Sequence, residues 1–205
     1  MNITILIIII TAIISYVSQN RQDIMQKLIM HPYTVSREKQ YYRLLTSGFI
    51  HSGLIHFFFN MLALYFFGPW IENIFKELHP GSGGLLYIVF YLSAIVVSDL
   101  TSLRKHKDNP GYFSLGASGA VSAIVFSWIM FFPTRTIYVY FIPMPGFILG
   151  VLYLIYSFYQ SKNPNSHINH DAHLWVAVYG VIFTTILYPS VIPRFIQQLS
   201  EFEIF

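Results

Sequence analysis

Long apolar runs, separated by shorter polar stretches, dominate the hydrophobic pattern of this chain. A run of this kind is typical of a helix that crosses the hydrocarbon core of a bilayer, where every backbone polar group must be satisfied within the helix. Six such runs are present, at about residues 3–17, 54–75, 85–100, 114–133, 145–159 and 172–188. The pattern therefore predicts an all-α membrane protein, a six-transmembrane-helix bundle in which residues 1–205 form a single transmembrane domain.

The segments between the runs predict loops of different kinds. Residues 20–47 are mixed and charged, with Pro32 as a helix breaker, so we expect a long loop there. The sequence Pro-Gly-Ser-Gly-Gly at residues 80–84 predicts a tight turn. Residues 137–142 are β-branched and aromatic, which favours an extended stretch at the membrane interface. The first run has no basic segment before it and no small-residue cleavage site, so it predicts a spanning helix rather than a removable signal peptide.

The composition agrees with a membrane protein. Hydrophobic residues make up 55% of the chain and charged residues only 10%, whereas a soluble domain carries roughly 25% charged residues. The absence of cysteine excludes disulfides and thiol chemistry. The formal net charge is +3 and there is no basic stripe with interleaved aromatic residues, so we expect no nucleic-acid partner.

The sequence Gly-Ala-Ser-Gly at residues 116–119 is the first candidate for chemistry. It places Ser118 between small residues near the start of the fourth apolar run. Small residues let another backbone approach closely, and free N–H groups at a helix start point toward developing negative charge. A nucleophile at this place would have part of an oxyanion hole beside it. Taken alone, the motif fits equally well a small-residue packing face between membrane helices.

Polar residues inside the other runs favour a role in chemistry. An ionisable side chain within a span is costly and by default suggests function. His56 and Asn60 are four residues apart and share one face of the second span, and His173 lies near the start of the sixth. Spans two, four and six all start on the same side of the membrane, so these side chains and Ser118 are expected at one depth. Ser118 and His173 would then form a nucleophile and its general base. His56, Asn60 and the Ser118 N–H would stabilise the oxyanion.

Together these motifs resemble the rhomboid intramembrane serine proteases. The resemblance implies a Ser–His dyad without a third acid, in which Ser118 is the nucleophile and His173 the base. It implies His56 and Asn60 as oxyanion-stabilising residues, and no cofactor. The matching elements are Gly-Ala-Ser-Gly at 116–119, His-Ser-Gly-Leu-Ile-His-Phe-Phe-Phe-Asn at 51–60, Ala-His with a glycine seven residues after the histidine at 172–180, Tyr42-Arg43 in the first loop, and Gly68 followed by Glu72.

The resemblance also implies a class of partner. The substrates would be transmembrane segments of membrane proteins, cleaved near one membrane face within the lipid bilayer. Spans two and five would form a lateral entrance, and the loop before span six would cap the site. The alternative is a catalytically weak or inactive rhomboid-like module that binds membrane segments.

Three positions depart from the pattern of that family. Ser122 stands where many members carry a Tyr or Phe that stacks on the catalytic histidine, so another group must orient His173. Val176 stands where glycine is common, so the close packing of spans four and six would depend on Ala177 and Gly180. The tryptophan of the first loop is replaced by a tyrosine.

The basic residues give a conflicting indication of orientation in the membrane. Most Lys and Arg residues lie on the active-site side, and Lys76, Arg135 and Arg194 lie on the other side. The positive-inside rule would place the active-site side in the cytoplasm, whereas the rhomboid family places it outside. We follow the family, because the first loop is long and is expected to be folded. The expected location is the cell membrane of a prokaryote.

The sequence argues against two other functional classes. His167, His170 and His173 are spaced by three and raise the possibility of a zinc site. Zinc proteases use two histidines four apart with a glutamate between them, and that glutamate is missing, so we expect no metal. A small transporter would show inverted repeats or broken helices near mid-membrane, and neither is apparent in the sequence.

Four further polar residues are interpreted as structural. His51 is expected to contact the first loop, and Asp171 to cap the sixth span or to form an interface charge. Asp99 is expected at the membrane interface, where the third span ends. Glu72 is expected to be a hydrogen-bonding group at the far end of the second span.

Overall fold

The computed structural model describes residues 2–139, 141–162 and 170–203. Helices account for nearly all regular structure in these ranges, with one two-stranded hairpin in addition. The elements in chain order are α1 (Ile3–Asn20), α2 (Gln22–Leu28), α3 (Pro32–Glu38), α4 (Arg43–Thr46), the 3-10 helix η1 (Ser47–Phe49), α5 (Leu54–Leu78), α6 (Gly83–His106), α7 (Ser118–Phe131), β1 (Thr136–Val139), β2 (Ile142–Pro145), α8 (Gly146–Gln160), α9 (His170–Leu187) and α10 (Val191–Ser200).

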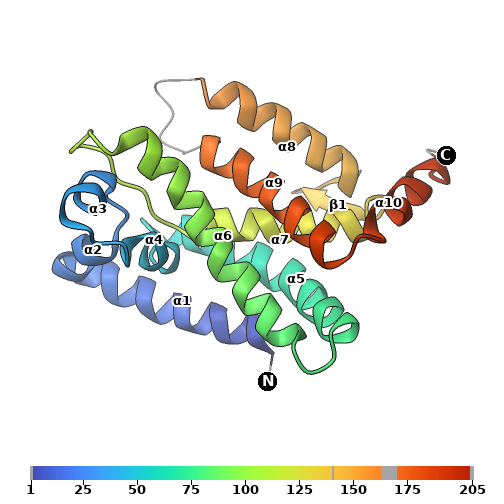
Figure 1. The fold of residues 1–205 in the computed structure, drawn as a ribbon, viewed down its shortest axis with the longest axis horizontal. Helices are drawn as coiled ribbons and strands as arrows, with labels where there is room; N and C mark the ends of the chain where they lie inside the picture. The colour runs from blue at the N-terminus through green and yellow to red at the C-terminus, as the bar shows by residue number, and fades with distance from the viewer. Residues whose placement is uncertain (1, 140, 163–169, 204–205) are drawn as a thin grey trace.

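Helix α7 lies at the centre of the fold. Of its 14 residues, 11 are buried, and they lie on every side of the helix. A helix that is apolar all round is stable only when other helices surround it. Helices α5, α6 and α9 pack directly against α7, and α8 packs against α9 (Figure 1). The first residue of α7 is Ser118, so the central helix carries the predicted nucleophile at its end.

Two glycines let neighbouring helices pack closely against α7, because a Cβ atom at either position would clash with the facing helix. A Cβ atom added to Gly180 on α9 would lie 2.4 Å from the carbonyl oxygen of Ala123 on α7. One added to Gly119 on α7 would lie 2.5 Å from the Oγ atom of Ser98 on α6. The predicted use of Gly180 for close packing of spans four and six is therefore confirmed. Val176 is accommodated at a fully buried position on α9.

Glu72 ties α1 to α5. Its carboxylate accepts hydrogen bonds from the backbone N–H groups of Ile3 and Thr4, each at 2.8 Å, and from the hydroxyl of Thr4 at 2.8 Å. Lys76, one turn later on α5, forms an ion pair with the same carboxylate. The first N–H groups of a helix have no partner within it, and a carboxylate there also interacts favourably with the helix dipole. The predicted structural role of Glu72 is confirmed.

The first loop is more structured than its mixed composition suggested. Residues 20–47 form α2, α3 and α4 with a small core of their own, made by Met30, Val35 and Leu44. The guanidinium of Arg43 is buried and donates to the carbonyls of Gln26 at 2.7 Å and Ile29 at 2.8 Å. The expectation that this loop is folded is confirmed. Its three short helices were not predicted, because only a few apolar side chains and one buried arginine hold the segment against α6.

Helix α6 is longer than its apolar run. It continues past residue 100 to His106, through a final turn whose basic residues complement the negative end of the helix dipole. Asp99 is therefore inside the helix and buried, and its carboxylate accepts a hydrogen bond from the hydroxyl of Ser47. The third helix therefore does not end near Asp99 as predicted.

The C-terminal segment contains a helix that the sequence analysis missed. After α9 the chain turns by 112° into α10. Val191 of α10 is buried, whereas Ile192 and Ile196 are exposed. The helix was missed because its apolar residues are interspersed with polar ones rather than gathered in one run.

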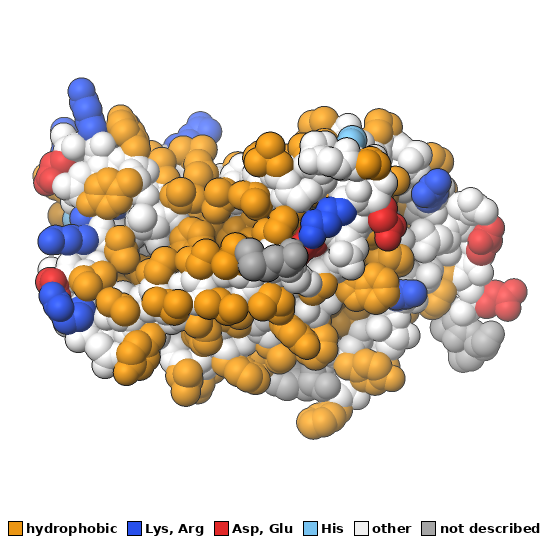
Figure 2. Space-filling view, turned by 90° about the horizontal axis from the view of Figure 1, so that it is seen from below, with side chains coloured by type: hydrophobic (Ala, Val, Ile, Leu, Met, Phe, Trp, Pro, Cys, Tyr) orange, Lys and Arg blue, Asp and Glu red, His pale blue; other side chains and the backbone are white. Residues whose placement is uncertain are grey.

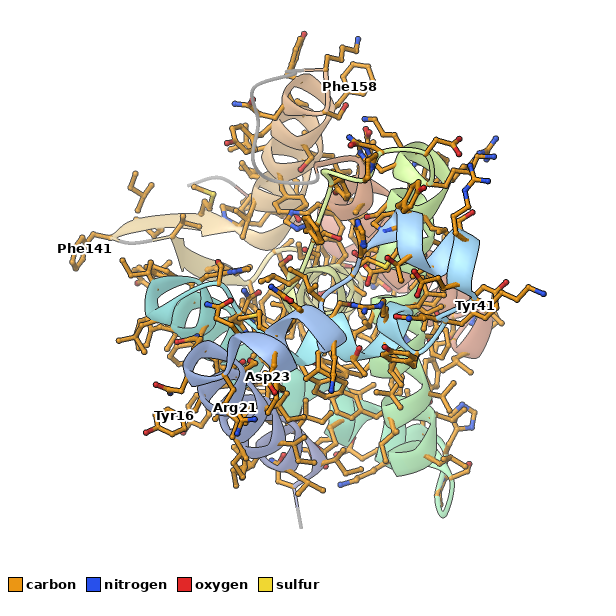
Figure 3. All side chains as sticks on the ribbon, turned by 90° about the vertical axis from the view of Figure 1, so that its left-hand side faces the viewer. Tyr16, Arg21, Asp23, Tyr41, Phe141 and Phe158 are labelled. Carbon is orange, nitrogen blue, oxygen red and sulfur yellow. The ribbon has the colours of Figure 1, made fainter. Side chains whose placement is uncertain are left out.

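The predicted extended stretch near residues 137–142 is a β-hairpin. Strands β1 and β2 are antiparallel, and Thr136 pairs with Pro145 and Val139 with Ile142. Tyr140 lies outside the described residues. Phe141 is 93% exposed and projects away from the rest of the protein at the end of the hairpin (Figure 3).

The surface is that of an integral membrane protein. Among the described residues, α1, α5 and α6 are each long and apolar enough to cross a membrane, and α9 with α10 passes the same test as a bent pair. Helices α7 and α8 are apolar but shorter. Figure 2 shows a broad band of hydrophobic side chains across one face, with charged side chains at both ends of the view and in a smaller group right of centre.

Candidate active site

Ser118 begins α7 at the end of an extended approach segment. Gly116, two residues earlier, has a φ of +116°, a conformation that side chains with a Cβ atom rarely adopt. A Cβ atom there would also lie 2.6 Å from Cε1 of His56. Only glycine satisfies both conditions. Because Ser118 is the first helical residue, its N–H has no hydrogen-bond partner within the helix.

Contacts to three parts of the fold fix this approach segment. Ser114 and Met30 exchange two backbone hydrogen bonds of 3.0 Å, which attaches the segment to the first loop. The N–H of Gly116 donates to the carbonyl of Ser47 at 2.9 Å, and the hydroxyl of Ser47 donates to Asp99 of α6. The segment leading to Ser118 is therefore held before any substrate arrives.

The structure brings Ser118 and His173 together. Their Oγ and Nε2 atoms are 2.8 Å apart, although the residues are 55 positions apart in the sequence. Both side chains are half-buried. Ser118 stands at the start of α7 and His173 near the start of α9, and these two helices are packed closely through Gly180. The distance suits proton transfer from the hydroxyl to the imidazole.

His56 lies beside the approach segment, and the side chain of Asn60 makes a hydrogen bond within its own helix, α5. The ring of His56 packs on Gly116, and its Nδ1 atom lies 3.3 Å from the hydroxyl of Ser52. The amide of Asn60 is buried and donates to the backbone carbonyl of His56 at 2.9 Å. The two predicted oxyanion residues are thus near one another on α5, and Asn60 uses one of its two N–H donors within the helix in this arrangement.

His51 has a supporting position that sequence reasoning did not identify. Its ring is fully buried, with Nδ1 2.9 Å from the hydroxyl of Ser15 on α1 and Nε2 accepting from the N–H of Ala117 at 3.3 Å. Its ring centroid lies 5.0 Å from that of His56. Burial, with a smaller contribution from His56, lowers the pKa of His51 to about 3. His51 is therefore neutral and contacts α1 and the residue before Ser118, rather than the first loop as predicted.

Ser122 makes a hydrogen bond to α8. Its hydroxyl lies 2.7 Å from the Tyr153 hydroxyl, and the Tyr153 ring packs near Phe126 at 5.4 Å between centroids. An aromatic side chain of α8 thus lies beside Ser122. The sequence could not predict this contact, because nothing in it pairs residue 122 with residue 153.

The zinc hypothesis rested on three histidines near the start of α9. His167 lies outside the described residues, and the described part of the chain contains no group of three or more His, Asp or Glu side chains placed to hold a metal. The Nε2 atom of His173 is directed at Ser118. Asp171, in the first turn of α9, forms an ion pair with Lys105 of α6.

A family model described as the Rhomboid domain matches residues 38–190, which is most of the chain. The chain belongs to the rhomboid family. This rhomboid is 33% identical over 174 residues to RHOMBOID-like protein 12, mitochondrial, of Arabidopsis thaliana, in an alignment that covers 77% of this chain and 51% of the relative. It is also 34% identical over 87 residues to RHOMBOID-like protein 2 of the same plant, covering 42% and 24% of the two chains.

The match to the Rhomboid family model covers much more of the chain than the motif residues alone. The matched region begins in the first loop and ends after α9, so it contains α5, α7 and α9 together with all four predicted site residues of this rhomboid. The chain spans about half the length of the first of these relatives. Both relatives are plant proteins, so they lend no support to the expectation of a prokaryotic origin.

Proposed function

We propose that this chain is an intramembrane serine endopeptidase that cleaves transmembrane segments near one membrane face. The observation that carries the proposal is the 2.8 Å distance between Ser118 Oγ and His173 Nε2. Membership of the rhomboid family supports it. A serine and a histidine at this distance form an activated nucleophile with its general base.

The proposed reaction is an acyl transfer in two halves. Ser118 Oγ attacks the scissile carbonyl carbon while its proton moves to His173 Nε2, which requires a neutral imidazole with its proton on Nδ1. The tetrahedral intermediate collapses, the C–N bond breaks, and Nε2 returns the proton to the leaving amine. A water molecule then attacks the acyl-enzyme, again giving its proton to Nε2. Breakdown of this second intermediate frees the acid product and restores the Ser118 hydroxyl.

The oxyanion would form beside the first turn of α7. The Ser118 N–H is unpaired within the helix, and His56 and Asn60 come from the neighbouring α5. Each donor aimed at the oxyanion contributes about 3 kcal/mol of barrier lowering. Asn60 would take up this role by turning its amide from the His56 carbonyl toward the intermediate.

The depth of the site supports cleavage within the membrane. At 14 residues, α7 is about 21 Å long by helix rise, less than the ~30 Å of the hydrocarbon core. We propose that the C-terminal end of α7 lies at one membrane surface, in which case a helix of this length leaves Ser118 below the opposite surface. We propose that residues 1–205 act as one rhomboid-like domain with six spans, and that substrates enter laterally between α5 and α8.

The proposed location is a prokaryotic cell membrane, with the active-site end outside the cytoplasm. The folded first loop supports this orientation, because a compact segment weakens the positive-inside preference of its basic residues. The chain has no cysteine, so single cysteines report accessibility without background. An impermeant maleimide added to intact cells should label Tyr41→Cys and leave Glu201→Cys unlabelled. The reverse labelling would invert the orientation.

The decisive experiment is cleavage of a transmembrane substrate in liposomes by the wild type, Ser118→Ala and His173→Ala. Ser127→Ala, farther along α7, is the matched serine control. We expect activity in the wild type and control, loss in both site variants, and no effect of a chelator. Activity that survives Ser118→Ala would refute the serine mechanism, and loss with chelator would revive a metal. Binding of the segment without cleavage by the wild type would favour the binding-module alternative.

A further inference from the structure

A surface groove runs between α6 and α9, apart from the candidate active site. Its volume is about 840 Å³, and neither Ser118 nor His173 lines it. Figure 1 shows α9 lying beside the upper part of α6, and the two helices are in direct contact. The lining residues are Val97, Leu100, Thr101, Arg104 and Lys105 of α6 and Asp171, Trp175, Val178, Tyr179 and Ile182 of α9.

Most of the groove is apolar and open to the outside. On α9, Trp175, Val178 and Ile182 follow one another at helical spacing, so they form a single stripe. Leu100 of α6 is 46% exposed, Trp175 59% and Ile182 50%. In a bilayer such side chains lie against lipid tails, and a concave surface contacts a tail from two sides. The apolar part of the groove therefore suits one acyl chain.

One end of the groove is basic. Lys105 is paired with Asp171, whereas Arg104 has no hydrogen bond or ion pair within the part of the chain that the structure describes. Two cations and one carboxylate leave an excess of one positive charge at this end. A guanidinium binds a phosphate through two parallel hydrogen bonds, and it does so more favourably than it binds water at a partly apolar surface.

The relative position of the basic end and the apolar walls indicates which kind of molecule fits the groove. The basic end lies at the C-terminal turn of α6, where the helix leaves its apolar stretch. From Arg104 back to Val97 is about 10 Å by helix rise, so the apolar walls continue from the basic end toward the membrane interior. A charged head at one end and a long apolar tail below it are the parts of a phospholipid. A peptide segment would match the apolar walls but would not need the excess charge.

We propose that the groove between α6 and α9 binds an anionic phospholipid of the surrounding bilayer, with its phosphate at Arg104 and one acyl chain along Leu100, Trp175 and Ile182. This site depends on insertion of the chain in a membrane and does not depend on proteolysis. Asp171 lies two residues before His173, so the occupant would lie beside the start of the helix that carries the proposed base.

Trp175 provides a direct probe of the site. The full chain is reconstituted in vesicles that contain a brominated-chain phosphatidylglycerol or the matching brominated phosphatidylcholine, because bromine quenches tryptophan fluorescence at contact. The difference between the wild type and Trp175→Phe isolates the signal of this residue from Trp70 and Trp128. We expect a preference for the anionic lipid of about fivefold at Trp175, the effect of one basic residue near a membrane surface.

Matched variants separate a site from general surface charge. Arg104→Gln should reduce the preference to near one, and Lys107→Gln, which removes a basic residue outside the groove, should leave it unchanged. The Ser118→Ala variant should retain the preference, which keeps this test independent of the proposed protease activity. Equal quenching by the two lipids in the wild type would overturn the proposal, and so would an equal loss in Arg104→Gln and Lys107→Gln.

Discussion

The N–H of Ala117 donates to Nε2 of His51 at 3.3 Å, so a buried, neutral histidine holds the residue directly before Ser118. This hydrogen bond needs the unprotonated nitrogen, because an imidazolium has no acceptor. Burial lowers the pKa of His51 to about 3, below the value of about 6.5 in an unfolded chain. Because the pKa of His51 is lower in the folded state than in the unfolded state, the free energy of unfolding must decrease as the pH falls.

The first prediction is acid sensitivity of folding through His51. Above pH 6.5 both states are neutral at this residue and its stabilising effect is complete. As the pH falls from 6.5 toward 3, the unfolded state takes up the proton first, and stability falls by about 1.4 kcal/mol per pH unit. Unfolding in detergent measured between pH 7.5 and 4.5 should show this slope. His51→Asn, which does not titrate, should flatten it, and an unchanged slope in that variant would exclude His51 as the cause.

The second prediction concerns Glu72, whose carboxylate caps α1 from α5. Replacing Glu72 with Ala removes the acceptor of three hydrogen bonds from Ile3 and Thr4 and leaves the Lys76 charge without its partner. We expect a loss of about 3 kcal/mol of stability, because hydrogen bonds to charged groups contribute about 1.5–3 kcal/mol each and partial rehydration offsets part of the loss. Glu77→Ala, on the same helix and exposed, is the matched control. Similar unfolding curves for the two variants would contradict the capping role.

The third prediction concerns the contact between α7 and α9. A methyl group at Gly180 would meet the backbone of Ala123, which cannot move aside, so Gly180→Ala should push α9 away from α7. We expect a loss of about 1–3 kcal/mol of stability from overpacking. Since α9 carries His173, cleavage should fall by up to about 100-fold, the cost of a displacement near 1 Å at a reacting group. Gly53→Ala is the control, because an added Cβ there has no neighbour within 4 Å, and it should keep wild-type stability and cleavage. Wild-type activity in Gly180→Ala would show that the site tolerates a larger distance between α7 and α9.

The fourth prediction concerns the hydrogen bond between Ser122 and Tyr153. If the two hydroxyls stabilise the contact of α7 with α8, Ser122→Ala and Tyr153→Phe should each cost about 1 kcal/mol, and the double variant should cost little more than either one. Thermal or denaturant unfolding of the four proteins measures this coupling. Additive losses would mean that each hydroxyl acts separately.

The fifth prediction separates chemistry from structure at Asn60. Asn60→Ala removes a proposed oxyanion donor, so kcat should fall by about 100-fold or more while KM changes little. Asn20→Ala is the matched control, because Asn20 makes the same amide-to-carbonyl bond to the residue four positions earlier, Tyr16, at an exposed place on α1. Equal activity in Asn60→Ala and the wild type would remove Asn60 from the oxyanion role.

The sequence by itself determined the class of protein and the position of most helices. Runs of apolar residues without charge have few stable structures in water or in lipid other than membrane helices, so the pattern alone locates α1, α5, α7, α8 and α9 closely. The motif residues were also identifiable, because a polar side chain in an apolar run is costly and stands out. Parity of the spans then indicated that Ser118 and His173 could meet, and they do.

Tertiary structure alone decided what the polar residues contact. The roles of His51 and Asp99 follow from partners 66 and 52 residues away, Ala117 and Ser47. The hydrogen bond between Ser122 and Tyr153 likewise joins residues that are far apart in the sequence. Such pairings depend on the rotation and tilt of each helix about its neighbours, and these are set by the packing of small side chains such as Gly180 against backbone. The hydrophobic pattern predicts the long apolar helices, but it leaves their rotations free, so only the packed structure determines the site.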